Sequence, residues 1–271
     1  QYVKMGIKQE EHIRLATEFA NRTLELDPES GDANYTLGLV DMLNGKVRDA
    51  ISKLKKAIST DPYNSDYLLW CAWFYMVLGK PSAAQSLLNV VLKSDPFNRN
   101  IDIVEGPMAC FEGKHEMAAK ICKAAYKNQP NNPLILFFSS LCLAYVGRVK
   151  EAITQISESH LIKDYSGIVQ LSRLLKGTLE KDLAEISQIM TEEFIKTSKR
   201  DGQYSFHVAC CYSYLGQTDV SIDWLENAVE RDFLNYPLMN KYDPFLENIR
   251  GEERFKKLMK RVKYEWENFE V

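Results

Sequence analysis

The 271-residue sequence predicts an all-α fold, a right-handed superhelix of about six to seven stacked helix pairs that ends in a capping helix. The first observation is a proline every 34 residues, at Pro28, Pro62, Pro96 and Pro130. Two further registers keep this interval, namely Gly45, Gly79, Gly113 and Gly147, and Ala50, Ala84, Ala118 and Ala152. A period of this length indicates structural repeats that stack side by side.

Each of the three residue types has a physical role at its position. Proline lacks an N–H group and disfavours helix in the residue before it, so it ends one helix and opens a turn. Glycine commonly ends a helix at a positive φ. The alanine five residues later lies in the second helix, where its small side chain lets two helix backbones approach closely. Each repeat is therefore predicted to be a helix, a Gly turn, a second helix and a Pro turn.

This pattern resembles the tetratricopeptide repeat, a 34-residue helix pair. The resemblance rests on the following residues of the first two full repeats: Leu37, Gly38, Ala50, Leu54, Ala57, Pro62, Leu68, Ala72, Tyr75, Ala84, Leu88 and Pro96. Two later repeats match at Gly106, Ala109, Ala118, Ala125, Pro130, Leu136, Leu143, Ala152 and Ile156. The resemblance implies a superhelical fold and says little about function, because one fold hosts many functions.

The repeats divide the chain in order. Residues 1–232 form the predicted solenoid, with a partial repeat at 1–30, full repeats at 31–64, 65–98, 99–132 and 133–160, a degenerate repeat at 161–200 and a last repeat at 202–232. The partial repeat starts within a unit, so we expect the natural protein to continue upstream; a short capping helix at 1–8 is the alternative. The degenerate repeat is expected to hold helices near 165–176 and 182–198, separated by Gly177 and Thr178.

Residues 233–271 are predicted to cap the solenoid, with a last helix near 252–267, because an end repeat needs a polar outer face. The stretch Tyr242-Asp243-Pro244-Phe245-Leu246, followed by Arg250-Gly251, resembles the end of repeat regions attached to bacterial adenylate cyclases, serine/threonine kinases and winged-helix regulators. This second resemblance implies an alternative function, the regulatory or sensory C-terminal part of a larger bacterial signalling protein.

Composition argues against several partners. The net charge is −3, and the basic cluster Lys256, Lys257, Lys260, Arg261 and Lys263 is flanked by glutamates, so we interpret it as a solvated helix face and expect no nucleic-acid partner. No apolar run is long enough to cross a bilayer, which takes about 18 residues. Six cysteines lie in apolar helical runs, which favours a reducing compartment and a cytoplasmic location. Because the chain starts at Gln1, an upstream targeting or membrane segment stays open.

No catalytic, cofactor or metal site is predicted. The four histidines, His12, His115, His160 and His207, are scattered and do not pair at helical spacing. His207 lies near Cys210 and Cys211, a placement that suits a packed or groove-lining histidine better than the alternative, a Cys–His catalytic pair. The chain is therefore expected not to be an enzyme.

The resemblance implies a concave surface lined by the first helix of each repeat. Its register predicts partner-binding residues at Tyr35, Leu39, Met42, Leu69, Trp73, Met76, Ile103, Phe111, Phe137, Leu141, Tyr145, Phe206 and Tyr214. These side chains are apolar or aromatic, which suits an amphipathic helix or a hydrophobic peptide better than a peptide carboxylate. The sequence thus predicts a protein-interaction scaffold with an apolar groove. Two alternatives stay open, a groove filled by the chain itself and a self-association surface. Pro107 is expected to kink the first helix of its repeat.

Overall fold

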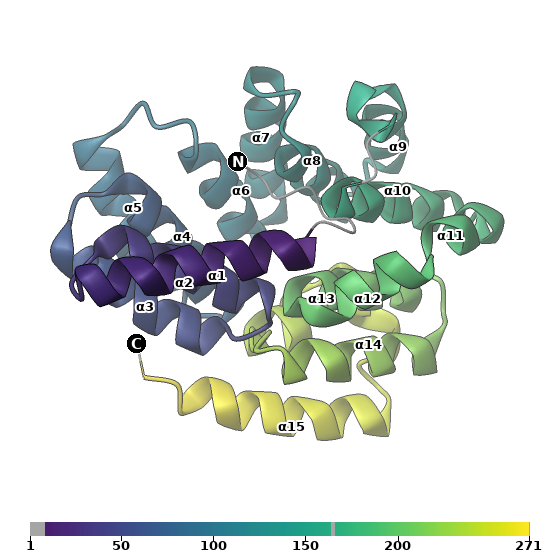
Figure 1. Ribbon diagram of the computed structural model, residues 1–271. Helices are drawn as coiled ribbons and strands as arrows, with labels where there is room; N and C mark the ends of the chain where they lie inside the picture. Colours follow the sequence, from purple (N-terminus) through teal and green to yellow (C-terminus); the bar gives the residue numbers. More distant parts are fainter. Residues whose placement is uncertain (1–8, 164–165, 271) are drawn as a thin grey trace.

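The computed structural model describes residues 9–163 and 166–270, and these form helices and turns without a β-strand (Figure 1). The predicted all-α solenoid is confirmed. After α1 (Gln9–Leu26), four helix pairs follow: α2 (Gly31–Leu43) with α3 (Val47–Thr60), α4 (Ser65–Val77) with α5 (Pro81–Ser94), α6 (Ile101–Phe111) with α7 (His115–Asn128), and α8 (Pro133–Tyr145) with α9 (Val149–Glu158). The alternative capping helix at 1–8 lies outside the described residues.

The turns between paired helices and between repeats explain this regularity. Gly45, Gly79, Gly113 and Gly147 each follow a first helix at φ between 67 and 78°, the conformation that the sequence predicted for the glycine register. At the other end, polar residues cap the first helices; the side chain of Asn64, for example, accepts hydrogen bonds from the N–H groups of Asp66 and Tyr67. Each cap satisfies donors that the first turn of a helix leaves free.

The two helices of a repeat differ in burial. In α4, ten of the eleven residues from Tyr67 to Val77 are buried, whereas in its partner α5 only Ala84, Leu88 and Val91 are buried. The first helices therefore form the interior of the superhelix, and the second helices present a polar face outward. Pro107 lies inside α6 and does not end it, since the helix continues to Phe111.

The degenerate repeat corrects two sequence predictions. A short turn, η1 (His160–Lys163), leads to α10 (Gly167–Glu180), which runs through Gly177 and Thr178 and ends where Lys181 adopts a left-handed φ of 58°. The predicted break at Gly177 is therefore wrong; a Cβ there would lie 3.1 Å from the Ile186 side chain, so the glycine serves close packing. The single helix expected at 182–198 is two, α11 (Leu183–Ile189) and α12 (Glu192–Arg200), because Thr191 caps a new helix.

The C-terminal part follows as α13 (Gly202–Tyr214), α14 (Thr218–Glu230), the short turns η2 (Leu238–Tyr242) and η3 (Pro244–Ile249), and α15 (Glu253–Glu267). In Figure 1, α12 to α15 lie beside the N-terminal helices, so the superhelix curls back on its own start. Ion pairs join the two ends: Arg48 contacts Asp232 at 2.6 Å, and Lys196 contacts Glu10 at 3.0 Å. One continuous apolar core runs from Val47 to Val262.

No helix within residues 9–163 and 166–270 combines the length and the apolar character that crossing a bilayer requires.

Candidate functional site

The predicted groove residues fall into two groups in the structure. Eight are buried, with at most 8% of their surface exposed: Leu69, Trp73, Met76, Ile103, Phe111, Phe137, Leu141 and Phe206. Five are half-buried and pack against the same core: Tyr35, Leu39, Met42, Tyr145 and Tyr214. The register places all thirteen on first helices, as expected, but the eight do not line an open groove.

Aromatic rings meet where the hollow of the superhelix was expected. The ring of Trp73 packs edge-on against Phe138 at 5.6 Å between centroids, and its Nε1 donates a hydrogen bond to the Gln203 side chain. Phe206 stacks on Phe233 at 4.3 Å, and Phe111 packs against Phe233 at 6.2 Å. Residues from the second, third, fourth and last repeats thus form one interior with a ring from the C-terminal region.

A stretch of chain after α14, which we call the axial segment (residues 231–246), fills this interior. It passes the Gly turns of successive repeats. A Cβ on Gly79 would lie 2.9 Å from Oδ1 of Asn235, and a Cβ on Gly113 would lie 2.6 Å from the ring of Tyr242. The axial segment therefore approaches these turns so closely that only glycine fits there.

Polar contacts hold the axial segment to three repeats. The amide of Asn235 donates to the carbonyl oxygen of Met76 at 2.8 Å, and the ring Nε2 of His115 lies 2.9 Å from the carbonyl oxygen of Tyr242. The Tyr145 hydroxyl donates to the carboxylate of Asp243 at 2.5 Å. The eight buried positions therefore do not form an open groove, and three of them, Met76, Phe111 and Phe206, contact the axial segment directly.

A second concave feature lies on the outside of the molecule, between the second helices of adjacent repeats. It is an open cleft of about 740 Å³, which we call the outer cleft. It is lined by Glu116, Met117, Ala119, Lys120, Lys123, Ala124 and Lys127 of α7 and by Arg148 at the start of α9. Four cations thus line one cleft in a chain whose net charge is −3.

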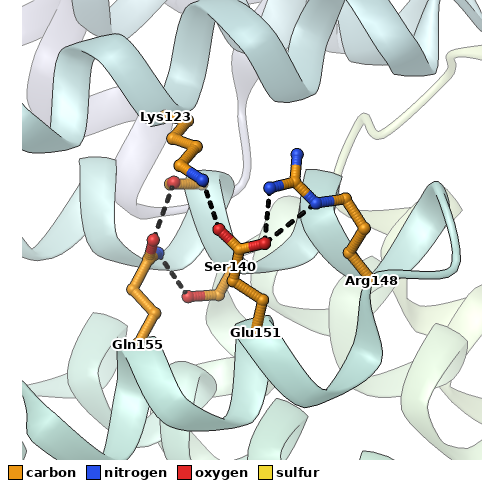
Figure 2. Close-up of polar contacts among 6 residues, drawn as sticks. Lys123, Ser140, Arg148, Glu151 and Gln155 are labelled. Atoms are coloured by element: carbon orange, nitrogen blue, oxygen red, sulfur yellow. Dashed lines mark hydrogen bonds and ion pairs between the residues drawn. The ribbon is translucent and has the colours of Figure 1, made fainter.

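An ion-pair network fixes one wall of the outer cleft (Figure 2). Glu151 of α9 pairs with Lys123 of α7 and with Arg148, whose Nε lies 2.9 Å from the carboxylate. These two cations lower the pKa of Glu151, Lys123 having the larger effect. The side chain of Gln155 bonds to Ser140 at 2.9 Å and to Ser139 at 3.3 Å, which holds α9 against α8. Glu151 is therefore a fixed carboxylate between cations of two repeats.

The comparisons with known proteins fit this geometry. The family model of the tetratricopeptide repeat matches residues 41–102. Residues 41–102 therefore carry tetratricopeptide repeat sequence. In the solved structure of the APC/C hetero-tetramer Cut9–Hcn1, a chain of 15% identity superposes with a TM-score of 0.59 over 94% of this chain, which spans 46% of that one. A search of curated proteins found no match.

Two smaller solved structures are also similar. A structure from a study of PilF of Pseudomonas aeruginosa shares 15% identity, with a TM-score of 0.47 over 85% of this chain and 97% of that one. PilW, described as a type IV pilus biogenesis factor, shares 15% identity, with a TM-score of 0.48 over 80% of this chain and 96% of that one.

The side chains considered for catalysis are buried. His207 is 3% exposed among phenylalanine rings, with Phe137 at 4.8 Å, and burial lowers its pKa to about 3. All six cysteines are free and buried, and burial raises the pKa of Cys71 and Cys211 to about 12. A neutral histidine and thiols that are buried inside a core have no access to a substrate. Within the described ranges, no three His, Cys, Asp or Glu side chains are placed to hold a metal ion.

The outer cleft does not coincide with the basic cluster that stands out in the sequence, at residues 256–263. On α15 that cluster is paired internally, with Lys256 on Glu253 and Arg261 on Glu265. The sequence of α7 does contain a pattern that indicates the cleft, because Lys120, Lys123 and Lys127 recur at intervals of three and four residues. This spacing places three lysines on one helix face.

Proposed function

We propose that this protein is a non-catalytic protein-interaction scaffold that binds its partner on the outer surface of the repeats. The observation that carries the proposal is the axial segment, which occupies the concave face from the second repeat to the fourth. Repeat solenoids offer extended surfaces for binding. In this chain the axial segment packs in the interior, so we expect the outer surface to bind the partner.

The free energy needed to expose the axial segment favours a binding site on the outer surface. The axial segment buries six large apolar side chains, each at most 5% exposed: Phe233, Leu234, Leu238, Met239, Phe245 and Leu246. Burying such a side chain contributes about 1.5–3 kcal/mol, so exposing all six would cost on the order of 10 kcal/mol. Because whole domains are stable by about 5–15 kcal/mol, a peptide would have to supply most of the stability of the protein to displace the segment.

The second helices remain free for a partner. In α3, α5 and α7 most residues outside the buried stripe are exposed, and these helices follow one another on the outer face. Protein partners commonly bind such polar surfaces through a few anchoring side chains rather than through total area. The partner that we propose is a protein, and neither nucleic acid nor membrane is part of the proposal.

Cross-linking in the native cells tests the proposal. The full-length protein would be cross-linked in situ, isolated by an affinity tag, and its partner cross-links located by mass spectrometry. We expect them on residues of α3, α5, α7 and α9. Cross-links concentrated around Trp73 and Phe111 would mean that a partner displaces the axial segment, and would overturn the outer site. A second copy of this chain as the cross-linked species would indicate self-association instead.

The alternative from the sequence, a regulatory part of a bacterial signalling protein, stays a prediction. The coding sequence next to this segment would test it, since a cyclase, kinase or winged-helix domain is expected there.

A further inference from the structure

We propose that the outer cleft binds an acidic amphipathic helix of a partner protein. This inference rests on the proposed function and names the site and the chemistry of the partner. Its first support is charge. Lys120, Lys123, Lys127 and Arg148 line the cleft, and Glu116 and Glu151 are the carboxylates beside them. The cleft is therefore cationic on a chain that carries a net charge of −3, so it attracts an acidic segment specifically.

Two of the four cations have no ionic partner in the described structure. Lys123 and Arg148 are both paired with Glu151, whereas Lys120 and Lys127 form no ion pair with any residue in the described ranges. Both side chains are exposed at the cleft. They lie seven residues apart on one helix face, about 10 Å along the axis. Carboxylates spaced by two turns on a partner helix would match this separation.

Glu151 shows how a carboxylate pairs with two of the cations that line this cleft. It bridges Lys123 of one repeat and Arg148 of the next, and Gln155 fixes the helix that carries it (Figure 2). A partner glutamate next to Lys120 or Lys127 would extend this row of alternating charges along α7. The cleft is thus preorganised by its own network, which limits the entropy lost on binding.

The lining between the lysines is apolar. Met117 is 53% exposed, and Ala119 and Ala124 lie between the charged side chains. Aliphatic side chains of an amphipathic helix would bury Met117, whereas a nucleic-acid backbone offers none. This feature favours an acidic helix over a phosphate backbone, which would use the same lysines. The volume of about 740 Å³ is within the range of pockets that bind ligands and side chains.

A synthetic peptide tests this directly on the full chain. The probe is a fluorescein-labelled 16-residue helix of Glu, Ala and Leu, with glutamates spaced to repeat every seven residues on one face and leucines beside them. Its control has every Glu replaced by Gln. Fluorescence anisotropy should show saturable binding of the first peptide and at least about tenfold weaker binding of the second, because the contacts are ionic.

Matched variants locate the binding. The double substitution Lys120→Ala and Lys127→Ala should weaken it by about two- to thirtyfold, from exposed ion pairs of about 0.2–1 kcal/mol each. Arginine at both positions should retain it. The control is Lys55→Ala with Lys56→Ala on α3, two exposed lysines without an ion pair in the described structure, and it should leave binding unchanged. Unchanged circular dichroism would show that each variant folds.

Three outcomes would overturn the inference. No saturable binding of the acidic helix is the first. Equal weakening by both double substitutions is the second, since it would indicate non-specific attraction. Tighter binding of a 16-nucleotide oligo-dT than of the helix is the third, and would indicate a polyanion site. Each of these leaves the proposed scaffold function intact if cross-linking still finds a protein partner on other outer helices.

Discussion

Replacing Trp73 by alanine tests whether the concave positions are core or contact surface. If Trp73 lined an open groove, truncation would remove partner binding and leave the fold intact. In the structure its side chain is 3% exposed, packs against Phe138 and donates a hydrogen bond to Gln203. We therefore expect Trp73→Ala to destabilise the protein strongly.

The structure sets the magnitude of this effect. Truncating a buried tryptophan or phenylalanine to alanine costs about 3–5 kcal/mol. Losing the indole N–H also leaves the carbonyl of Gln203 without its donor, which costs about 1–3 kcal/mol for a buried group. Allowing for overlap of the two effects, we expect about 4–6 kcal/mol. Trp73→Phe, which keeps a ring in the cavity, should cost about 1–2 kcal/mol.

Urea unfolding followed by circular dichroism measures this directly. The matched control is Phe97→Ala, because Phe97 is 92% exposed and its truncation should change stability by less than about 0.5 kcal/mol. A change below about 1 kcal/mol for Trp73→Ala, with loss of partner binding, would refute the reasoning and restore the open groove.

Three further predictions concern buried polar groups. Burial lowers the pKa of His207 to about 3, so the native state resists its protonation, and stability should fall as pH drops below about 6.5, the pKa of an unfolded histidine. The free energy of unfolding is expected to fall by about 2 kcal/mol from pH 7.5 to pH 5, and His207→Phe should abolish this fall. An identical dependence of stability on pH in the wild-type protein and in His207→Phe would contradict the prediction. Burial raises the pKa of Asp201 to about 6, although hydrogen bonds from two backbone N–H groups act in the opposite direction. The protein should therefore lose stability as pH rises from about 4 to 6, because the buried carboxyl group becomes charged. Asp201→Asn keeps the helix cap without its charge, so it should raise the melting temperature at pH 7.5 but not at pH 4. A lower melting temperature at both pH values would argue against the raised pKa of Asp201. Asn235→Ala removes the hydrogen bond to the carbonyl oxygen of Met76 and should lower the free energy of unfolding in urea by about 2–3 kcal/mol. An unchanged free energy of unfolding would show that this contact does not stabilise the protein.

The repeated part of the fold could be predicted because its signals are local. Each Gly turn, such as Gly45 or Gly79, depends on a helix end a few residues away, and the 34-residue interval carries this from repeat to repeat. The two-helix form of residues 182–200 was missed although Thr191 is a good N-cap residue, because the apolar spacing continues across it.

The filling of the groove could not be predicted from the spacing. Trp73 and Gln203 are 130 residues apart in sequence, and Asn235 and Met76 are 159 apart, so no local pattern links them. The register correctly placed Trp73 and Phe111 on inner helices, but the apolar character that suited a peptide groove equally suits a core. Whether these side chains are core or contact surface depends on how the superhelix curls, and the axial segment bonds to three successive repeats within that curl.

Hydrogen–deuterium exchange of the axial segment tests the central claim most directly. The backbone N–H of Met239 bonds to Asn235, and that of Asp243 bonds to Leu238, at 3.0 and 2.9 Å inside the core. If the segment is an integral part of the interior, these amides should exchange as slowly as those of α4. If they exchange within seconds while α4 stays protected, the segment leaves the groove in solution, and the account of a filled concave face is contradicted.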